Sequence, residues 1–76
     1  MGDSDRTRWR CRRGLLELDL LLARFLERRF DGLDAGERRL FDELLEQPDN
    51  DLLDLALGRA EPHPRYRAVV ELLRAP

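Results

Sequence analysis

The 76-residue chain contains no lysine: all 14 of its basic residues are arginine. It has a single cysteine, Cys11, which excludes an internal disulfide and, without a partner at metal-ligand spacing, indicates a reducing compartment. No apolar run is long enough to cross a bilayer, so we expect no membrane insertion. Its five glycines do not form a phosphate-binding loop or a dinucleotide fingerprint. The sequence therefore offers no obvious nucleotide site of its own.

What is abundant is leucine and charge. The chain is 42% hydrophobic and 39% charged, a composition typical of amphipathic helices with solvated outer faces. The length predicts one domain, residues 1–76. The net charge of -2 is unevenly distributed along the chain. The N-terminal segment, residues 1–14, is basic, with five arginines and two aspartates. Residues 15–57 are acidic, with five arginines and twelve acidic residues. Such a basic N-terminal segment could bind nucleic acid, an anionic membrane or an acidic protein surface.

Apolar periodicity predicts a long helix from Leu15 to about Phe30. Its inner face recurs at three- and four-residue steps. Further leucines widen that face, so we expect this helix to be central and buried on two sides. The residues concerned are Leu15, Leu18, Leu22, Phe25 and Leu26 on the inner face, and Leu16, Leu20 and Leu21 beside it.

Three further helices follow from their boundary residues. Asp31-Gly32 ends the long helix, and Asp34 with Glu37 predicts a capping box that starts the next helix, which Pro48 ends. One of the polar residues 49–51 is expected to cap a short helix closed by Gly58. Pro64 suits the first turn of a last helix. With a short helix over residues 4–12, the sequence predicts an all-α bundle of about five short helices.

Gly14 is the unusual residue of this pattern. In a helix interior, glycine lowers helix stability by about 1 kcal/mol relative to alanine. An exposed Arg13–Glu17 ion pair, four residues apart, would stabilise the helix by less than this. Local stability therefore does not explain the arrangement. Either Gly14 is the hinge between a short first helix and the long second one, or it leaves bare backbone that another surface can approach closely, and the two explanations are compatible.

Three segments carry a family resemblance. They read W-x-C-R-R-G-x-x-E-L-D from Trp9 to Asp19, E-x-x-x-F-x-x-L-L-E from Glu37 to Glu46, and D-x-D-L from Asp49 to Leu52. Together they resemble the SdhE (YgfY) family of FAD assembly factors of succinate dehydrogenase and fumarate reductase. Leu55 departs from the family pattern, which often has tryptophan at that position.

The resemblance implies a five-helix bacterial cytoplasmic protein, monomeric when free, that is not an enzyme. Such a protein binds the flavoprotein subunit of succinate dehydrogenase or fumarate reductase and promotes covalent attachment of FAD to it, with no catalytic residue, metal or stably bound cofactor of its own. The Arg-Gly-x-x-Glu motif falls on Arg13, Gly14 and Glu17. We expect the partner-binding residues to be Trp9, Arg12, Arg13, Gly14, Glu17 and Asp19. Arg13 could donate a bidentate hydrogen bond to the partner, and Glu17 could accept one.

Other functions remain open at this point. One is a nucleic-acid-binding or antitoxin-like regulator that uses the basic segment 6–13, although the acidic total disfavours it. Another is a small enzyme using Cys11 or Glu17, which would need a pocket and a perturbed pKa.

Four kinds of side chain have simple structural explanations. Cys11 is expected to be a small buried apolar residue, Trp9 to be partly buried, and His63 to lie in a surface loop. The acids between Asp42 and Asp54 are expected to form a solvated face.

Overall fold

A computed structural model describes residues 3–75. In chain order the elements are α1 (Asp3–Arg10), α2 (Leu16–Arg28), the 3-10 turn η1 (Phe30–Gly32), α3 (Ala35–Leu44), α4 (Asp49–Ala56), the 3-10 turn η2 (Pro64–Tyr66) and α5 (Arg67–Arg74). Within this range no strand is present, and the predicted all-α class with five helices is confirmed. The long helix ends at Arg28, slightly earlier than predicted, because η1 tightens the chain before α3.

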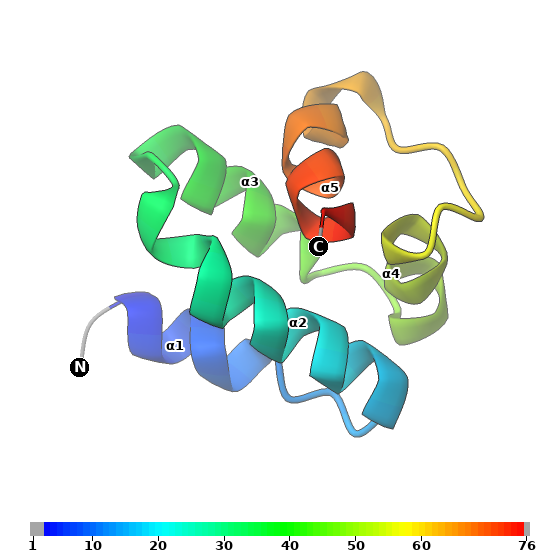
Figure 1. The fold of residues 1–76 in the computed structure, drawn as a ribbon, viewed down its shortest axis with the longest axis horizontal. Helices are drawn as coiled ribbons and strands as arrows, with labels where there is room; N and C mark the ends of the chain where they lie inside the picture. The colour runs from blue at the N-terminus through cyan, green and yellow to red at the C-terminus, as the bar shows by residue number, and fades with distance from the viewer. Residues whose placement is uncertain (1–2, 76) are drawn as a thin grey trace.

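The helices surround one hydrophobic core. α1 and α2 run in opposite directions along one side of the molecule, and α5 lies between α3 and α4 (Figure 1). α5 contacts α2, α3 and α4, which makes the C-terminal helix the element that closes the bundle. Phe41 of α3 is completely buried, and its ring centroid lies 4.7 Å from that of Phe25 on α2. Aromatic packing across α2 and α3 therefore forms the centre of the core.

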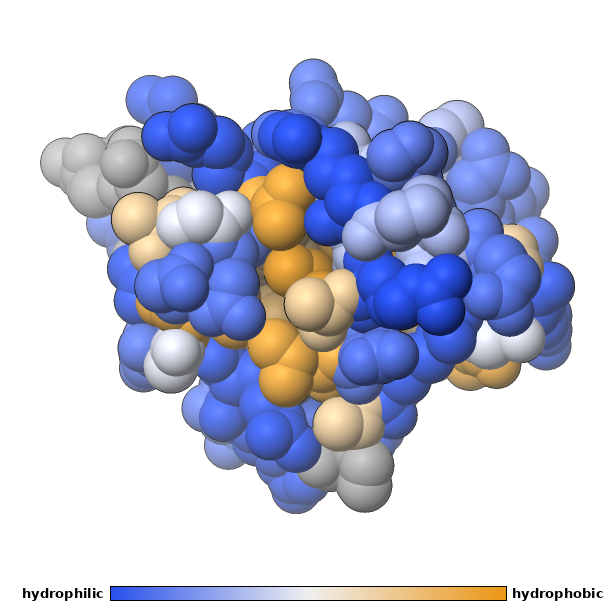
Figure 2. Space-filling model, turned by 90° about the horizontal axis from the view of Figure 1, so that it is seen from above, coloured by the Kyte–Doolittle hydropathy of each residue, from blue (hydrophilic) through white to orange (hydrophobic). Residues whose placement is uncertain are grey.

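The surface agrees with the composition. Seen from above, hydrophilic side chains cover most of the molecule, and apolar side chains reach the surface along a narrow strip between them (Figure 2). None of the helices within residues 3–75 is long and apolar enough to cross a membrane.

Local capping signals explain where two helices begin or end. The predicted capping box is confirmed: the Asp34 carboxylate accepts a hydrogen bond from the Glu37 N–H at 2.7 Å, and the Glu37 carboxylate accepts one from the Asp34 N–H at 3.0 Å. Gly58, with φ of 78°, follows α4 as predicted. The Arg59 N–H donates to the carbonyl of Asp54 and the Gly58 N–H to that of Leu55, which is the Schellman pattern.

The start of α4 differs from the prediction. Pro48 occupies the N-cap, and no side chain caps the helix. Asp49 and Asp51 lie instead in the first helical turn, where their negative charge favours the positive end of the helix dipole.

His63 lies in an exposed loop, as predicted. Its Nδ1 accepts a hydrogen bond from the Arg65 N–H at 3.1 Å and so caps η2.

The expectation that α2 is buried on two sides is wrong. Leu18 and Leu22 are fully buried, but Leu16 is 73% exposed and Leu20 is 60% exposed. Trp9, expected to be partly buried, is 71% exposed. Within residues 3–75, Leu16 and Leu20 on α2 and Trp9 on α1 are therefore large apolar side chains that face solvent near the sequence motif.

Candidate functional site

The candidate site begins at the loop between α1 and α2. Gly14 lies in this loop with φ of 84°, a conformation that side-chain-bearing residues rarely adopt. A methyl group built at Gly14 would meet no atom within 4 Å. The glycine is therefore required by the backbone turn and not by crowding, which confirms its prediction as the hinge between the two helices. Its backbone is also open to an approaching surface.

Asp19 fixes the shape of this loop. Its Oδ1 accepts a hydrogen bond from the Arg13 N–H at 2.8 Å, and its Oδ2 accepts one from the Gly14 N–H at 3.1 Å. Both carboxylate oxygens thus hold backbone N–H groups of the loop that precedes α2. Asp19 therefore stabilises the loop through hydrogen bonds within the protein itself.

Arg13 reaches from the same loop to the connection between α3 and α4. Its Nε donates to Oδ1 of Asp49 at 2.7 Å, and its Nη2 donates to the carbonyl of Gln47 at 2.6 Å. Its Nη1 donates to the carbonyl of Leu45. The side chain is only 14% exposed. One guanidinium therefore joins the loop before α2 to the connection between α3 and α4.

This placement changes the interpretation of the Arg13–Glu17 spacing. Arg13 is not helical, and its contacts are with Leu45, Gln47 and Asp49, so the ion pair considered for a continuous helix does not form. The contact that Arg13 makes with a partner stays a prediction, and it would have to use the donors that these internal bonds leave over.

Glu17 has the opposite character. It lies in the first turn of α2 and is exposed. Among residues 3–75 no hydrogen bond or ion pair holds its carboxylate. A carboxylate presented in this way is available to a partner's arginine, lysine or amide group.

We call the exposed side chains of the motif and its immediate neighbours in sequence the motif surface: Trp9, Arg12, Leu16, Glu17 and Leu20. Leu16 and Leu20 are four residues apart on α2, so they lie on one face, with Glu17 beside them. The Arg12 guanidinium lies over the Trp9 ring, 5.9 Å from its centroid.

An open groove of about 940 Å³ continues this surface between α1 and α2. Arg12, Gly14 and Leu20 all line it. The motif surface thus combines exposed apolar side chains with unlike charges, which is the composition of a protein-binding patch.

Cys11 lies beneath the groove and is buried, as predicted. Burial raises the pKa of its thiol from an ordinary 9.0 to about 12, even though the nearby Arg13 opposes this rise. The thiolate is the nucleophilic form of cysteine. Cys11 is therefore a packing residue, and the structure gives no basis for a cysteine enzyme.

Several acids expected to form a solvated face have internal partners. Asp42 accepts a hydrogen bond from the buried Thr7 hydroxyl at 2.8 Å, which fixes α1 against α3. Glu43 accepts hydrogen bonds from Arg65 and from the Tyr66 hydroxyl, and these contacts lower the pKa of Glu43. These pairs have no local sequence signal because their members lie more than 20 residues apart. In the part of the chain that the structure covers, no three metal-ligating side chains come together.

These features define a small all-α protein with exposed apolar and charged side chains at the start of its longest helix. A family described as "Flavinator of succinate dehydrogenase" (Sdh5) matches residues 5–76. The chain belongs to this family, so its resemblance to FAD assembly factors is confirmed.

Curated relatives agree with this assignment. The FAD assembly factor SdhE of Coxiella burnetii is 51% identical over 59 residues, covering 78% of this chain and 72% of the relative. SdhE of Ralstonia nicotianae is 47% identical over 75 residues, covering 92% of this chain and 79% of the relative. SdhE of Legionella pneumophila (strain Paris) is 38% identical over 72 residues, covering 95% and 91%. These names describe assembly factors and not enzymes, and they give the nucleic-acid-binding alternative no support.

Proposed function

We propose that this protein binds the flavoprotein subunit of succinate dehydrogenase and promotes the covalent attachment of FAD to that subunit. The observation that carries the proposal is the family match over residues 5–76, a range that includes the Arg-Gly-x-x-Glu motif between α1 and the first turn of α2. In this proposal the flavin belongs to the partner, and its covalent bond forms there. This chain contributes binding energy that favours a competent conformation of the partner.

The residues of the motif divide into two roles under this proposal. Asp19 and Arg13 are positioning residues, because their side chains hold the loop and the α3–α4 connection. Glu17 is the contact residue, since its carboxylate is exposed and the bonds within residues 3–75 do not engage it. Gly14 supplies both the turn and a backbone that the partner can approach.

Apolar contacts supply most of the affinity. Trp9, Leu16 and Leu20 lose exposed area when a partner covers the motif surface, and tryptophan is a residue type enriched among binding hot spots. Arg12, placed over Trp9, adds a cation at the edge of the contact. The charged residues then set orientation and register.

The proposal extends to fumarate reductase as a second client, to the bacterial cytoplasm as the location and to a monomer as the free state, as the resemblance implies. Light scattering of the purified protein tests the monomer, and attachment of FAD to the fumarate reductase flavoprotein tests the second client.

Binding of the partner provides the direct test. The purified flavoprotein subunit is titrated with labelled wild-type protein, with Glu17→Ala and with Glu71→Ala, which removes an exposed acid from α5 on a different element. We expect Glu17→Ala to weaken binding at least tenfold and Glu71→Ala to leave it unchanged within twofold. Equal binding by all three proteins would overturn the assignment of Glu17 as a contact.

A further inference from the structure

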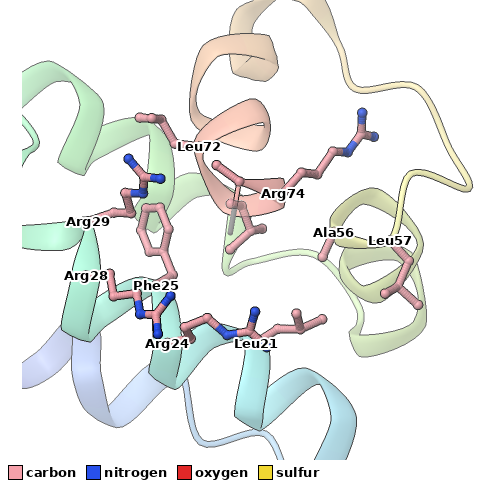
Figure 3. A pocket seen from close by; sticks show the side chains of 11 residues that line it. Leu21, Arg24, Phe25, Arg28, Arg29, Ala56, Leu57, Leu72 and Arg74 are labelled. Atoms are coloured by element: carbon pink, nitrogen blue, oxygen red, sulfur yellow. The ribbon is translucent and has the colours of Figure 1, made fainter.

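A second concave site lies on the other side of α2. It has a volume of about 300 Å³ and is bounded by α2, α4 and α5. The base of the site is apolar, with the buried Phe25 at its centre and half-buried Leu21 and Leu72 beside it (Figure 3). Leu57 at the end of α4 is 37% exposed. The site has room for one large apolar side chain of another molecule.

The charged side chains among the described residues that line this site are all arginines. Arg24 and Arg28 of α2, and Arg29 directly after this helix, lie around Phe25, and Arg74 of α5 lies on the opposite side (Figure 3). None of the residues that line the site is acidic. The nearest acid in sequence on α2, Glu27, lines the α1–α2 groove instead.

Contacts within the protein explain the positions of only some of these arginines. Arg74 donates through Nε and Nη2 to the carbonyl oxygens of Leu55 and Ala60, at 2.8 and 2.9 Å, and no acidic side chain within residues 3–75 forms an ion pair with it. Arg28 lies in the last turn of α2, where a cation favours the helix dipole.

Arg24 lacks this explanation. It lies before the last turn, is exposed, and is four residues from Arg28, a spacing at which like charges destabilise a helix. Within residues 3–75, no acidic side chain pairs with Arg24 or Arg28.

We propose that this site binds an acidic segment of a partner protein, with one apolar side chain inserted against Phe25 and flanking carboxylates on Arg24 and Arg28. Charge complementarity selects this occupant: a guanidinium forms strong bidentate hydrogen bonds with a carboxylate, and the apolar base requires a side chain that an inorganic anion lacks. The site is separate from the motif surface, so the inference goes beyond the proposed function and does not depend on it.

A random twelve-residue peptide library selected on the immobilised full chain tests this directly. Parallel selections use the double variant Arg24→Gln/Arg28→Gln and the control Arg67→Gln, which removes an exposed arginine of α5 that does not line the site. We expect wild type and Arg67→Gln to enrich peptides with aspartate or glutamate around leucine or phenylalanine. Enrichment of the same peptides by the double variant, or an absence of acidic peptides from the wild-type selection, would overturn the proposal.

The most enriched peptide then gives a quantitative test by fluorescence anisotropy. Its affinity should fall at least tenfold with the double variant, and also when its acidic residues are replaced by their amides. Amide resonances of Leu21, Leu57 and Leu72 should shift on binding. Undiminished binding of the amide peptide would overturn the proposal, as would binding of anionic phospholipid vesicles in place of the peptide through Arg24 and Arg28.

Discussion

Arg13 and Asp49 lie 36 residues apart in the chain, yet the Nε of Arg13 is 2.7 Å from Oδ1 of Asp49. The same guanidinium also binds the carbonyl groups of Leu45 and Gln47. The first residue of the Arg-Gly-x-x-Glu motif is thus a structural link between the α1–α2 loop and the α3–α4 connection, and its planar fork is essential to that link.

Replacing Arg13 by lysine should therefore destabilise the protein. A lysine ammonium cannot reach the carboxylate and both carbonyls in the same geometry, so we expect the free energy of unfolding to fall by about 2 kcal/mol. Urea unfolding followed by circular dichroism measures this change. An unfolding midpoint equal to that of the wild type would show that Arg13 acts on a partner alone.

Substitutions at Gly14 separate backbone strain from surface bulk. With φ of 84°, Gly14→Ala should cost about 1 to 2 kcal/mol of stability, and Gly14→Asn should cost less because asparagine tolerates this conformation. Gly14→Arg carries the same strain as alanine and adds a long side chain to the motif surface. We expect Gly14→Arg to lose FAD attachment to the flavoprotein while its helicity stays close to that of Gly14→Ala.

If Gly14→Ala and Gly14→Arg lose FAD attachment equally while both remain folded, the turn itself and not the approach of the partner would be the critical property. Circular dichroism and FAD attachment are measured on the same protein samples.

Two leucines of α2 should respond in opposite ways. Leu22 is fully buried, so Leu22→Ala should lower the free energy of unfolding by about 2 to 5 kcal/mol. Leu16 is 73% exposed, so Leu16→Ala should change stability by at most about 0.5 kcal/mol but weaken binding of the flavoprotein. Thermal unfolding and binding titrations of both variants test this contrast. A large loss of stability in Leu16→Ala would show that the exposed face of α2 is covered in the free protein.

Cys11 predicts a stability change at high pH. The raised pKa of about 12 keeps the thiol protonated in the folded state, whereas the unfolded chain loses this proton above about pH 9. The unfolded state then binds fewer protons, so stability falls as pH rises through this window. Between pH 8 and 10 the Cys11 contribution should decrease by about 1.4 kcal/mol. Urea unfolding at both pH values should show a smaller decrease for Cys11→Ala, and equal decreases would contradict the burial of the thiol.

The features that the sequence predicted correctly are local. The Asp34–Glu37 capping box and the turn at Gly58 depend on residues within a few positions of one another, and the buried face of α2 follows from helical spacing. Exposure of Leu16 and Leu20 could not be predicted, because leucines occur around much of α2 and only the packing of the other helices decides which are covered.

The sequence predicted where the candidate site lies, but it did not predict which motif residues face inward and which face solvent. Family resemblance identified Arg13, Gly14 and Glu17 together, whereas the structure shows that Arg13 faces inward and Glu17 outward. The partners of Arg13 lie more than 30 residues along the chain, and spacing within the motif carries no information about them. The exposed Trp9 was missed because tryptophan is more often buried than exposed.

Under the proposed function, the motif surface, through Glu17, promotes attachment of FAD to the partner. The most direct measurement incubates the flavoprotein subunit of succinate dehydrogenase with FAD and dicarboxylate, and then reads flavin fluorescence of the denatured subunit in a gel. We predict a fluorescent band that requires this protein, persists with Glu71→Ala and is lost with Glu17→Ala, although all three proteins have the same thermal stability. A band of equal intensity without this protein, or with Glu17→Ala, would contradict the account.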